Sequence, residues 1–430
     1  MSKLIVLSVD ALFDEDMAYL RTLPNFGKLM KKAAYSKDGM RSVYPSLTYP
    51  CHASIMTGTM PDTHGIFHNE KLDPGNPTPP WYWYHEALKV ETCLAAAKRA
   101  GLSTACIGWP VMGAAPEVDY LVPEIWPNGW DEDPRPIFET AASKDAETWA
   151  IIDRHLHKLR RTRQPFMDHV MIGCACDILR LHKPDIMFIH GAHLDHARHA
   201  NGIQGPMIQQ AIHDYDDWLG RLMEATMDAG TYEETNFCVT SDHGHLPVTK
   251  MLNPNVYLAE AGLIEVGENG ELKDWQAFCN STALSSQVIM KDPADDVVRA
   301  KLEKVLYALR NDLTSGVEAV FTKRELAEEM HVTGDFEYML EGRECTSFGN
   351  AWTGPKVVTP DNTDYKFSIT SHGHLPHKGP QPVFMMAGPD VKEGAVTERR
   401  HIIDEAPTFA ALLHFDMPQA TGKPMLELLK

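Results

Sequence analysis

The sequence lacks the marks of membrane-spanning and secreted proteins. No apolar run approaches the roughly 20 residues that a membrane-spanning helix needs. The apolar stretch after the N-terminal Met-Ser-Lys ends at Asp10, which is too early for a secretory signal. The eight cysteines are scattered without a Cys-x-x-Cys pair. We therefore expect reduced thiols in a cytoplasmic protein that does not bind membranes.

Basic residues are scarce as well. The 430 residues include 40 Lys and Arg against 59 Asp and Glu, which gives a net charge of −19. A basic face that follows a phosphate backbone is not expected, so binding to nucleic-acid polymers is excluded as a function class. An acidic protein still binds a small phosphorylated molecule where metal ions invert the local field.

What the chain does contain is an alternation of strand and helix patterns. Apolar runs typical of buried strands lie at 4–9, 103–107, 184–189, 236–240 and 383–387. Helical patterns lie at 49–58, 86–100, 146–181 and 207–227, and a Pro- and Gly-rich loop is expected at 108–135. This alternation predicts an α/β fold with a doubly wound, mostly parallel sheet flanked by helices.

The pattern changes in the second half of the chain. From about residue 246 to 370 it shows a hairpin-like stretch, two helices and irregular loops before one more strand returns. We therefore expect a catalytic core formed by residues 1–245 and 371–430, with residues 246–370 inserted as a cap subdomain. The cap is expected to shape substrate choice without supplying metal ligands.

Acidic and histidine residues follow the ends of several predicted parallel strands. They are Asp10, Asp195 with His199, Asp242 with His243, and His372. Ligands of an open α/β sheet bind at this edge, and Asp and His are the ligand types that Zn²⁺ or Mn²⁺ uses. One such turn alone is more often turn chemistry. Four of them at the same kind of position favour a metal site.

Two further residues have more than one interpretation. Thr48 precedes a predicted helix, where its hydroxyl is either a helix cap or a nucleophile beside N–H groups that favour an anion. Asn69 is either a turn residue or an amide donor. The aromatic segments 80–85 and 125–130 are suited to stacking a base or an aryl leaving group, although packing under a long loop is the favoured interpretation.

The motifs that contain these residues follow one another in a specific order. They are Val9-Asp10, Tyr44-Pro45-Ser46-Leu47-Thr48-Tyr49-Pro50-Cys51-His52, His64-Gly65-Ile66-Phe67-His68-Asn69, Asp195-x-x-x-His199, Ser241-Asp242-His243-Gly244 and Ser371-His372-Gly373. As a set they resemble the nucleotide pyrophosphatase/phosphodiesterase family of the alkaline phosphatase superfamily. The resemblance implies an alkaline phosphatase-like fold, and residues 246–370 carry none of it.

The resemblance also implies a two-metal phosphodiesterase or nucleotide pyrophosphatase that acts through a phospho-threonine intermediate at Thr48. It assigns one ion to Asp195, His199 and His372, and the other to Asp10, Asp242, His243 and the Thr48 oxygen. Zn²⁺ is the expected ion, with Mn²⁺ as the alternative. Asn69 is expected to donate to a phosphoryl oxygen, together with a backbone N–H near Thr48.

Other functions stay open at this point. Within the superfamily they are a phosphonate hydrolase that cleaves a carbon–phosphorus bond, similar to phosphonoacetate hydrolase, a phosphomonoesterase and a phosphomutase. From a different class, a pseudoenzyme would only bind metal or a phospholigand, although the complete set of ligands with Thr48 argues against it. The expected partner is a small phosphorylated or phosphonate substrate, and the oligomeric state is open.

Two candidate substrate-binding residues depart from the family's usual pattern. His374 follows Gly373 where the family often has Tyr, and Arg198 precedes His199 where a small residue is common. These departures concern the substrate and not the metals.

The charge of the substrate can also be argued from the sequence. A monoester dianion needs an extra cation, and the cationic candidates near the motifs are Arg198, Lys71 and Lys378. Asn69, a neutral donor, better suits the single charge of a diester. We therefore expect diesters to be turned over better than monoesters, unless Arg198 turns into the site.

Overall fold

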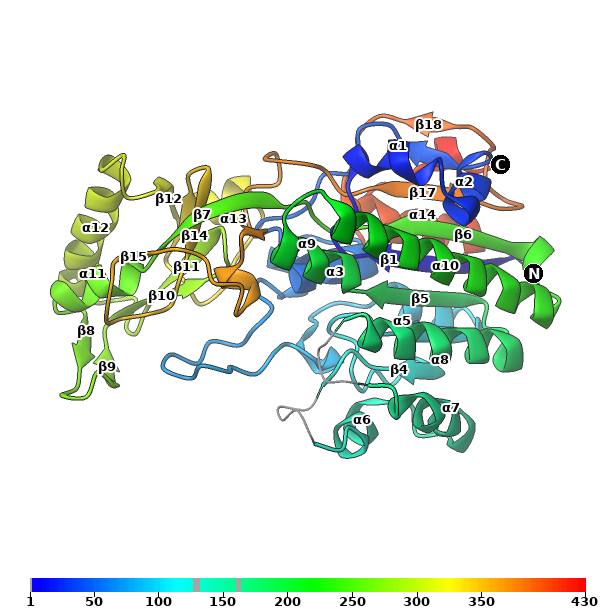
Figure 1. Ribbon diagram of the computed structural model, residues 1–430, viewed down its shortest axis with the longest axis horizontal. Coiled ribbons are helices and arrows are strands. Elements are labelled where there is room, and N and C mark those ends of the chain that lie inside the picture. The colour runs from blue at the N-terminus through cyan, green and yellow to red at the C-terminus, as the bar shows by residue number, and fades with distance from the viewer. Residues whose placement is uncertain (1, 127–131, 160–163) are drawn as a thin grey trace.

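The computed structural model describes residues 2–126, 132–159 and 164–430, and Figure 1 shows them arranged in two lobes. The larger lobe is built on an eight-stranded sheet in the order β18-β2-β17-β6-β1-β5-β3-β4. Its strands are β1 (Lys3–Val9), β2 (Ala34–Ser36), β3 (Thr104–Ile107), β4 (Tyr120–Val122), β5 (Ile186–Gly191), β6 (Thr235–Thr240), β17 (Phe384–Ala387) and β18 (Val396–Thr397). The strands from β6 to β4 pair in parallel, whereas β17 is antiparallel to both of its neighbours. The predicted α/β fold with a mostly parallel sheet is confirmed.

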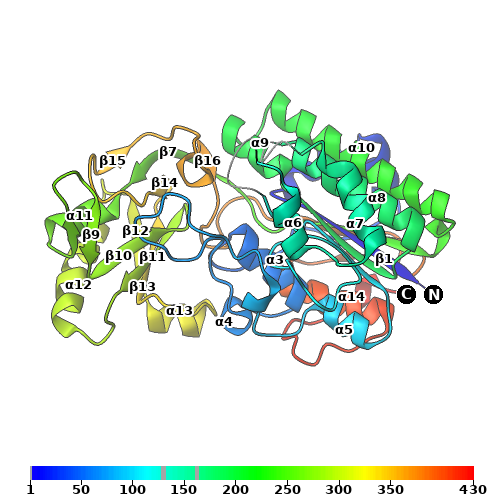
Figure 2. The same ribbon diagram turned by 90° about the horizontal axis from the view of Figure 1, so that it is seen from below.

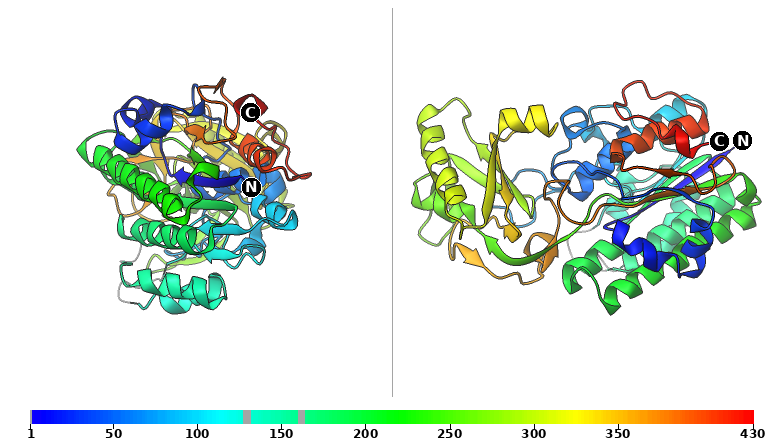
Figure 3. Two further views of the ribbon diagram at one scale, coloured as in Figure 1. Left: turned by 90° about the vertical axis from the view of Figure 1, so that its right-hand side faces the viewer. Right: turned by 90° about the horizontal axis from the view of Figure 1, so that it is seen from above.

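Strand β1 explains why helices cover both faces of this sheet. Ile5, Leu7 and Val9 pack into one apolar cluster, while Leu4 and Val6 pack into another, because successive side chains of a strand point to opposite faces. The first cluster includes residues of α1 (Met17–Leu20), α2 (Pro24–Met30), α6 (Arg135–Ala141), α7 (Ala146–Leu156), α8 (Phe166–His182), α9 (His193–Asn201) and α10 (Pro206–Ala229). The second includes residues of α3 (Thr48–Thr57), α5 (Cys93–Arg99) and α14 (Glu405–Leu413). Figure 3 shows these two helix layers on either side of the sheet.

The smaller lobe, which we call the second lobe, is formed by residues 246–370 (Figure 2). Its strands are β7 (Leu246–Leu252), β8 (Ile264–Val266), β9 (Leu272–Trp275), β10 (Ala277–Ser281), β11 (Ser285–Met290), β12 (Val317–Thr322), β13 (Tyr338–Gly342), β14 (Cys345–Phe348), β15 (Val357–Val358) and β16 (Thr370–Ser371). Its helices are α11 (Pro254–Glu260), α12 (Asp296–Asn311) and α13 (Lys323–Glu329). One sheet has the order β10-β11-β13-β12, and an apolar cluster separate from those of the larger lobe holds it together. The expected hairpin is the antiparallel pair β8–β9, and the cap role of the lobe stays a prediction.

The helix predicted over 86–100 is wrong in its first half. Residues His85–Ala87 form a single 3-10 turn, and α5 begins only at Cys93. The reason is the side chain of Thr92, which accepts a hydrogen bond from the N–H of Ala95 at 3.0 Å and so sets the helix start.

Two other predicted segments are divided differently in the structure. The helical pattern over 146–181 forms two helices, α7 and α8, and Pro165 is the residue immediately before α8. Proline is excluded from helix interiors and favours such a boundary. The loop predicted over 108–135 contains the short strand β4 at the edge of the large sheet.

No described helix is long and apolar enough to cross a membrane. All eight cysteines are unpaired in the structure, and every one except the half-buried Cys345 is buried. The cytoplasmic location stays a prediction.

Candidate active site

The ends of three parallel strands place most of the predicted ligands at one edge of the large sheet. Asp10 directly follows β1, Asp242 and His243 follow β6, and Asp195 with His199 lies on α9, which begins just after β5. Because β5, β1 and β6 are adjacent in the sheet, these side chains converge as the sequence predicts.

His372 reaches the site by a different route from the one predicted. It follows β16, a two-residue strand that pairs antiparallel with β7 and is no part of the large sheet. Backbone hydrogen bonds fix this segment, because the N–H of Gly373 donates to the Ser46 carbonyl at 2.9 Å and the N–H of Leu284 donates to the His372 carbonyl at 3.0 Å. His372 therefore does not follow a parallel strand of the large sheet, as was predicted, but the structure places its ring close to Asp195.

The first group of potential ligands is centred on Asp195. One of its carboxylate oxygens lies 3.4 Å from Nε2 of His199, and the other lies 3.8 Å from Nε2 of His372 and 2.6 Å from Nε2 of His245. These four residues come close enough together to hold one metal ion.

The hydrogen bonds behind His199 and His372 fix which of their ring nitrogens face Asp195. Nδ1 of His199 lies 2.7 Å from the carbonyl of Thr370, and Nδ1 of His372 lies 3.1 Å from the carbonyl of Ser46. Because a carbonyl oxygen only accepts, each Nδ1 carries the hydrogen, and in the neutral ring each Nε2 presents a lone pair. Such backing bonds are typical of metal-binding histidines.

His245 belongs to this group and was missed by sequence reasoning. Its Nδ1 lies 3.1 Å from the hydroxyl of Thr370, on the opposite side of the ring from Asp195. The signal in the sequence was a second imidazole two residues after His243, in the same Asp242-His243-Gly244-His245 turn.

The second group surrounds Nε2 of His243. This atom lies 3.1 Å from Oδ2 of Asp242, 3.5 Å from Oδ1 of Asp10 and 3.3 Å from Oγ1 of Thr48. Asp195 also comes within ligand distance of Asp10 and His243, so its carboxylate lies between the two groups.

Several buried polar atoms at the centre of these groups make no hydrogen bond within the described residues. They are Oδ1 of Asp10, Oδ2 of Asp242 and Nε2 of His199. A buried polar atom without a partner is costly, and each of these three atoms belongs to one of the two ligand groups. The donor set therefore fits metal cations.

The electrostatics of the carboxylates lead to the same conclusion. Burial raises the pKa of Asp10 well above its usual range, and the charge of Asp195 adds to this shift. Burial and the charge of Asp10 raise the pKa of Asp242 in the same way. Burial alone would also raise the pKa of Asp195, but His199 and His245 outweigh it and hold that pKa well below its usual value. Such crowded acids mark functional sites and are relieved by bound cations.

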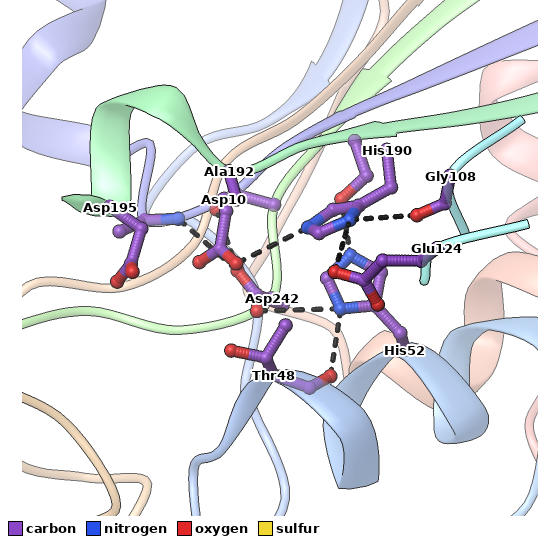
Figure 4. Close-up of polar contacts among 12 residues, drawn as sticks. Asp10, Thr48, His52, Gly108, Glu124, His190, Ala192, Asp195 and Asp242 are labelled. Atoms are coloured by element: carbon purple, nitrogen blue, oxygen red, sulfur yellow. Dashed lines mark hydrogen bonds and ion pairs between the residues drawn. The ribbon is translucent and has the colours of Figure 1, made fainter. Parts of the chain in front are cut away.

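Two further histidines, His190 and His52, support the second group from behind, as Figure 4 shows. Nε2 of His190 lies 3.2 Å from Oδ2 of Asp10, and its Nδ1 lies 3.0 Å from the carbonyl of Gly108. Nδ1 of His52 lies 2.8 Å from the carbonyl of Thr48. Sequence reasoning missed both, although His190 stands one position before the end of β5 and His52 follows Thr48 by one helical turn.

Thr48 and Asn69 lie side by side at the start of α3. Thr48 is the first residue of the helix, and the N-cap is Leu47, so the Thr48 hydroxyl does not serve as the cap. Oδ1 of Asn69 accepts a hydrogen bond from the N–H of Tyr49 at 3.0 Å. This bond occupies the backbone donor next to Thr48 and leaves the Asn69 amide nitrogen as the donor group of that side chain.

The comparison with protein families agrees with this geometry. The model of the family described as type I phosphodiesterase / nucleotide pyrophosphatase matches residues 4–363. The chain belongs to this family.

Curated relatives within the family are distant, and several are much longer. Human ectonucleotide pyrophosphatase/phosphodiesterase family member 1 is 26% identical over 268 residues, which are 58% of this chain and 24% of the human protein. An uncharacterised pyrophosphatase/phosphodiesterase of Schizosaccharomyces pombe is 25% identical over 58% of this chain and 46% of its own length. Human family member 5 is 23% identical over 96% of this chain and 74% of its own length. The chain thus spans about a quarter to a half of the first two relatives.

Solved structures show the same fold. Murine ectonucleotide pyrophosphatase/phosphodiesterase 5 superposes with a TM-score of 0.68 over the whole of both chains at 18% identity. The human counterpart gives the same TM-score and identity. These similarities confirm the alkaline phosphatase-like architecture that the motifs imply.

Within this family fold, Arg198 faces away from the metal groups. Its guanidinium contacts Asp16 at 2.5 Å, donates to the carbonyl of Ile203 and stacks 3.6 Å from the ring centre of Phe13. The side chain is fully buried in this position. The expected role of Arg198 in substrate binding is not supported by this placement.

His374 is not a member of either ligand group. Its Nε2 lies 3.1 Å from the backbone carbonyl of Lys378, and the ring lines a small cavity near Arg343 and Glu344. Burial lowers its pKa to about 3, so it is neutral at physiological pH. The structure therefore does not bring His374 to the predicted substrate.

The two aromatic segments pack on each other, which is the interpretation favoured from the sequence. Trp126 lies 5.1 Å from Trp81 and 5.4 Å from Trp83 between ring centres. Residues 127–130 of the second segment lie outside the described residues. The ring centre of Trp81 lies 6.0 Å from that of Tyr365 in the second lobe, and the ring of Tyr365 stacks on His372 with 5.8 Å between their centres. The aromatic cluster thus adjoins the first metal group.

Proposed function

We propose that this protein is a two-metal hydrolase of phosphodiesters or nucleotide pyrophosphates that acts through a phospho-threonine intermediate at Thr48. The position of the Thr48 hydroxyl carries the proposal. Its Oγ1 lies 3.3 Å from Nε2 of His243, the atom that the partnerless oxygens of Asp10 and Asp242 also approach. A hydroxyl in such surroundings is suited to nucleophilic attack.

Two divalent cations are part of the proposal. Asp195, His199 and His372 would hold one, and Asp10, Asp242, His243 and Thr48 would hold the other. Zn²⁺ suits these nitrogen and carboxylate donors best, and Mn²⁺ is the alternative. Bound cations of this kind lower the pKa of a nearby hydroxyl and neutralise charge on a phosphoryl group.

The residues of the chain have separate tasks in the reaction. Oγ1 of Thr48 forms a bond to phosphorus while the bond to the leaving oxygen breaks, and water then hydrolyses the phospho-Thr48 intermediate. The Asn69 amide nitrogen donates to a phosphoryl oxygen, since its Oδ1 is held by Tyr49. The dipole at the N-terminus of α3 also favours the anionic phosphoryl group, whereas the N–H of Tyr49 is taken by Asn69 and that of Cys51 by the Leu47 carbonyl.

The expected substrates are small phosphodiesters, including those of nucleotides. A solved structure of murine family member 5 is described as an inactive variant in complex with AMP, which supports a nucleotide product. The three cationic candidates near the motifs have other contacts, which supports diesters over monoesters. Arg198 pairs with Asp16, Lys378 pairs with Glu341, and Lys71 lies 5.9 Å from the ring centre of Tyr82.

A substrate panel tests the proposal. The wild type and Thr48→Ala are each incubated with four compounds. These are bis(4-nitrophenyl) phosphate, 4-nitrophenyl phosphate, an ester of a nucleoside diphosphate, and phosphonoacetate. We expect the diester and the nucleotide to be cleaved by the wild type and not by the variant. Phosphate release from phosphonoacetate alone would instead indicate a phosphonate hydrolase, and no turnover of any substrate would indicate a mutase or a binding protein.

A further inference from the structure

The loop that carries Asn69 is held by the second lobe. Residues 67–70 of this loop belong to the larger lobe in sequence, yet their polar contacts include three groups from residues 246–370. These contacts are with Gln287 of β11, Ser281 of β10, and Lys366, which lies in the short 3-10 turn Tyr365–Phe367.

The strongest of these contacts is a buried ion pair. Nζ of Lys366 donates to both carboxylate oxygens of Glu70, at 2.7 and 2.9 Å. The side chains of Lys366 and Glu70 are only 8% and 4% exposed, so the pair is shielded from solvent. In a place of low dielectric such a pair fixes the geometry of both partners more firmly than a surface pair does.

His68 makes the second contact, and its ring also bonds to the backbone of Glu70. Its Nε2 lies 3.0 Å from the carbonyl of Ser281, which only accepts, so this nitrogen carries the hydrogen. Nδ1 of the same ring accepts a hydrogen bond from the N–H of Glu70 at 2.8 Å. The third contact runs from the amide of Gln287 to the carbonyl of Phe67 at 2.8 Å.

Asn69 lies between these anchored residues. Its backbone carbonyl accepts from the N–H of Tyr82 at 3.0 Å, and its Oδ1 accepts from the N–H of Tyr49. The Asn69 side chain is therefore placed by these two bonds and by the anchored residues Glu70 and His68 on either side.

We propose that the second lobe positions Asn69, the hydrogen-bond donor to the phosphoryl oxygen, and that Lys366 and Glu70 are positioning residues for the reaction. The inference rests on the proposed function, because it assigns Asn69 the task of binding a phosphoryl oxygen. It gives the second lobe a part in catalysis without a metal ligand. A displacement of a catalytic group by about 1 Å is enough to cost on the order of 10²-fold in rate.

The test removes the ion pair without leaving a buried charge. The clamp variant, Glu70→Met with Lys366→Met, replaces both partners by apolar side chains of similar size, which buried pairs often tolerate. The control variant is Glu341→Met with Lys378→Met. This is a second Lys–Glu pair, at 2.7 Å, in which Glu341 is buried and Lys378 is partly buried, and it joins the second lobe to the segment after His372. Within the described residues, no hydrogen bond or ion pair links these two side chains to residues 67–70.

The readout is a double-mutant cycle with Asn69→Ala. For bis(4-nitrophenyl) phosphate, we expect the clamp variant to lower kcat/KM by about 10-fold or more when Asn69 is present, and by about twofold or less in the Asn69→Ala background. The control variant should stay within about twofold of the wild type in both backgrounds. Amide hydrogen exchange should become faster at residues 67–70 in the clamp variant only.

The outcomes separate this inference from the proposed function. The positioning role would be overturned if the clamp variant lowered kcat/KM equally with and without Asn69, or if amide hydrogen exchange at residues 67–70 did not change. Diester turnover by the wild type would still support the hydrolase. Absence of wild-type turnover on every phosphate ester would overturn the proposed function, and the catalytic role of the clamp would fall with it.

Discussion

Replacing Arg198 by alanine should damage stability and leave substrate preference unchanged. Arg198 stands immediately before His199 in sequence, so a role in binding the substrate phosphate is the natural alternative. In the structure its guanidinium is fully buried and contacts Asp16, the Ile203 carbonyl and the Phe13 ring.

The size of the effect follows from the contacts that are lost. In the intact pair the Asp16 side chain is 13% exposed. Arg198→Ala removes its cation, and breaking a buried pair in this way costs about 3–5 kcal/mol. Burial already raises the pKa of Asp16 despite the charge of Arg198, so the uncompensated carboxylate is the main cost. Asp16→Asn in the Arg198→Ala background should recover part of the loss, because it removes that charge.

Two assays check this prediction. Equilibrium unfolding in urea gives the free energy of unfolding of the wild type, Arg198→Ala and Asp16→Asn/Arg198→Ala. At a temperature where all three are folded, kcat/KM for bis(4-nitrophenyl) phosphate and 4-nitrophenyl phosphate gives the diester-to-monoester ratio. We expect the ratio to favour the diester equally in all three proteins. A wild-type preference for the monoester that disappears in Arg198→Ala would show that Arg198 binds the substrate phosphate.

Three further predictions follow from the site and the core. Thr48→Ala should keep the fold and both metals but lower kcat by about 10³-fold or more, as measured by steady-state kinetics and metal analysis, because the covalent route is lost. His199→Ala and Asp242→Ala should each deplete a different ion, and loss of both ions from either variant would contradict separate sites. His245→Ala should lower the affinity for one metal ion by about 10–100-fold, as measured in competition with a chelator. Burial lowers the pKa of His64 from 6.5 to about 3, so the unfolded chain binds a proton that the folded chain does not between these values. The free energy of unfolding should therefore fall as the pH falls from 6.5 toward 3, and His64→Gln should make this acid slope shallower by about 1.4 kcal/mol per pH unit in urea titrations; an unchanged slope would count against a neutral His64.

The sheet and the ligands on it could be predicted because their signals are local. The apolar runs of β1 and β6 end at Asp10 and just before Asp242, and parallel strands bring their carboxyl ends to one edge. The spacing of Asp195 and His199 places both on one face of a helical turn, and the structure keeps them 3.4 Å apart.

The remaining parts depend on contacts between distant segments, which a single sequence does not reveal. His372 follows β16, whose pairing with β7 is set within the second lobe. The sequence pattern allows the Arg198 side chain to turn into the site or away from it. Asp16, which lies 182 residues away along the sequence, decides the direction. His245 faces Asp195 because Thr370 lies behind its ring. The late start of the helix predicted over 86–100 has a local cause, the N-cap at Thr92, which periodicity alone does not weigh.

The metal content of the purified protein decides whether the two ligand groups hold two cations that the reaction needs. Mass spectrometric metal analysis is combined with diester turnover before chelation, after chelation, and after addition of Zn²⁺ or Mn²⁺. We expect two divalent transition-metal ions per chain, loss of turnover on chelation and recovery on addition of either ion. A protein that contains no transition metal, and whose turnover does not respond to added Zn²⁺ or Mn²⁺, would rule out a two-metal mechanism.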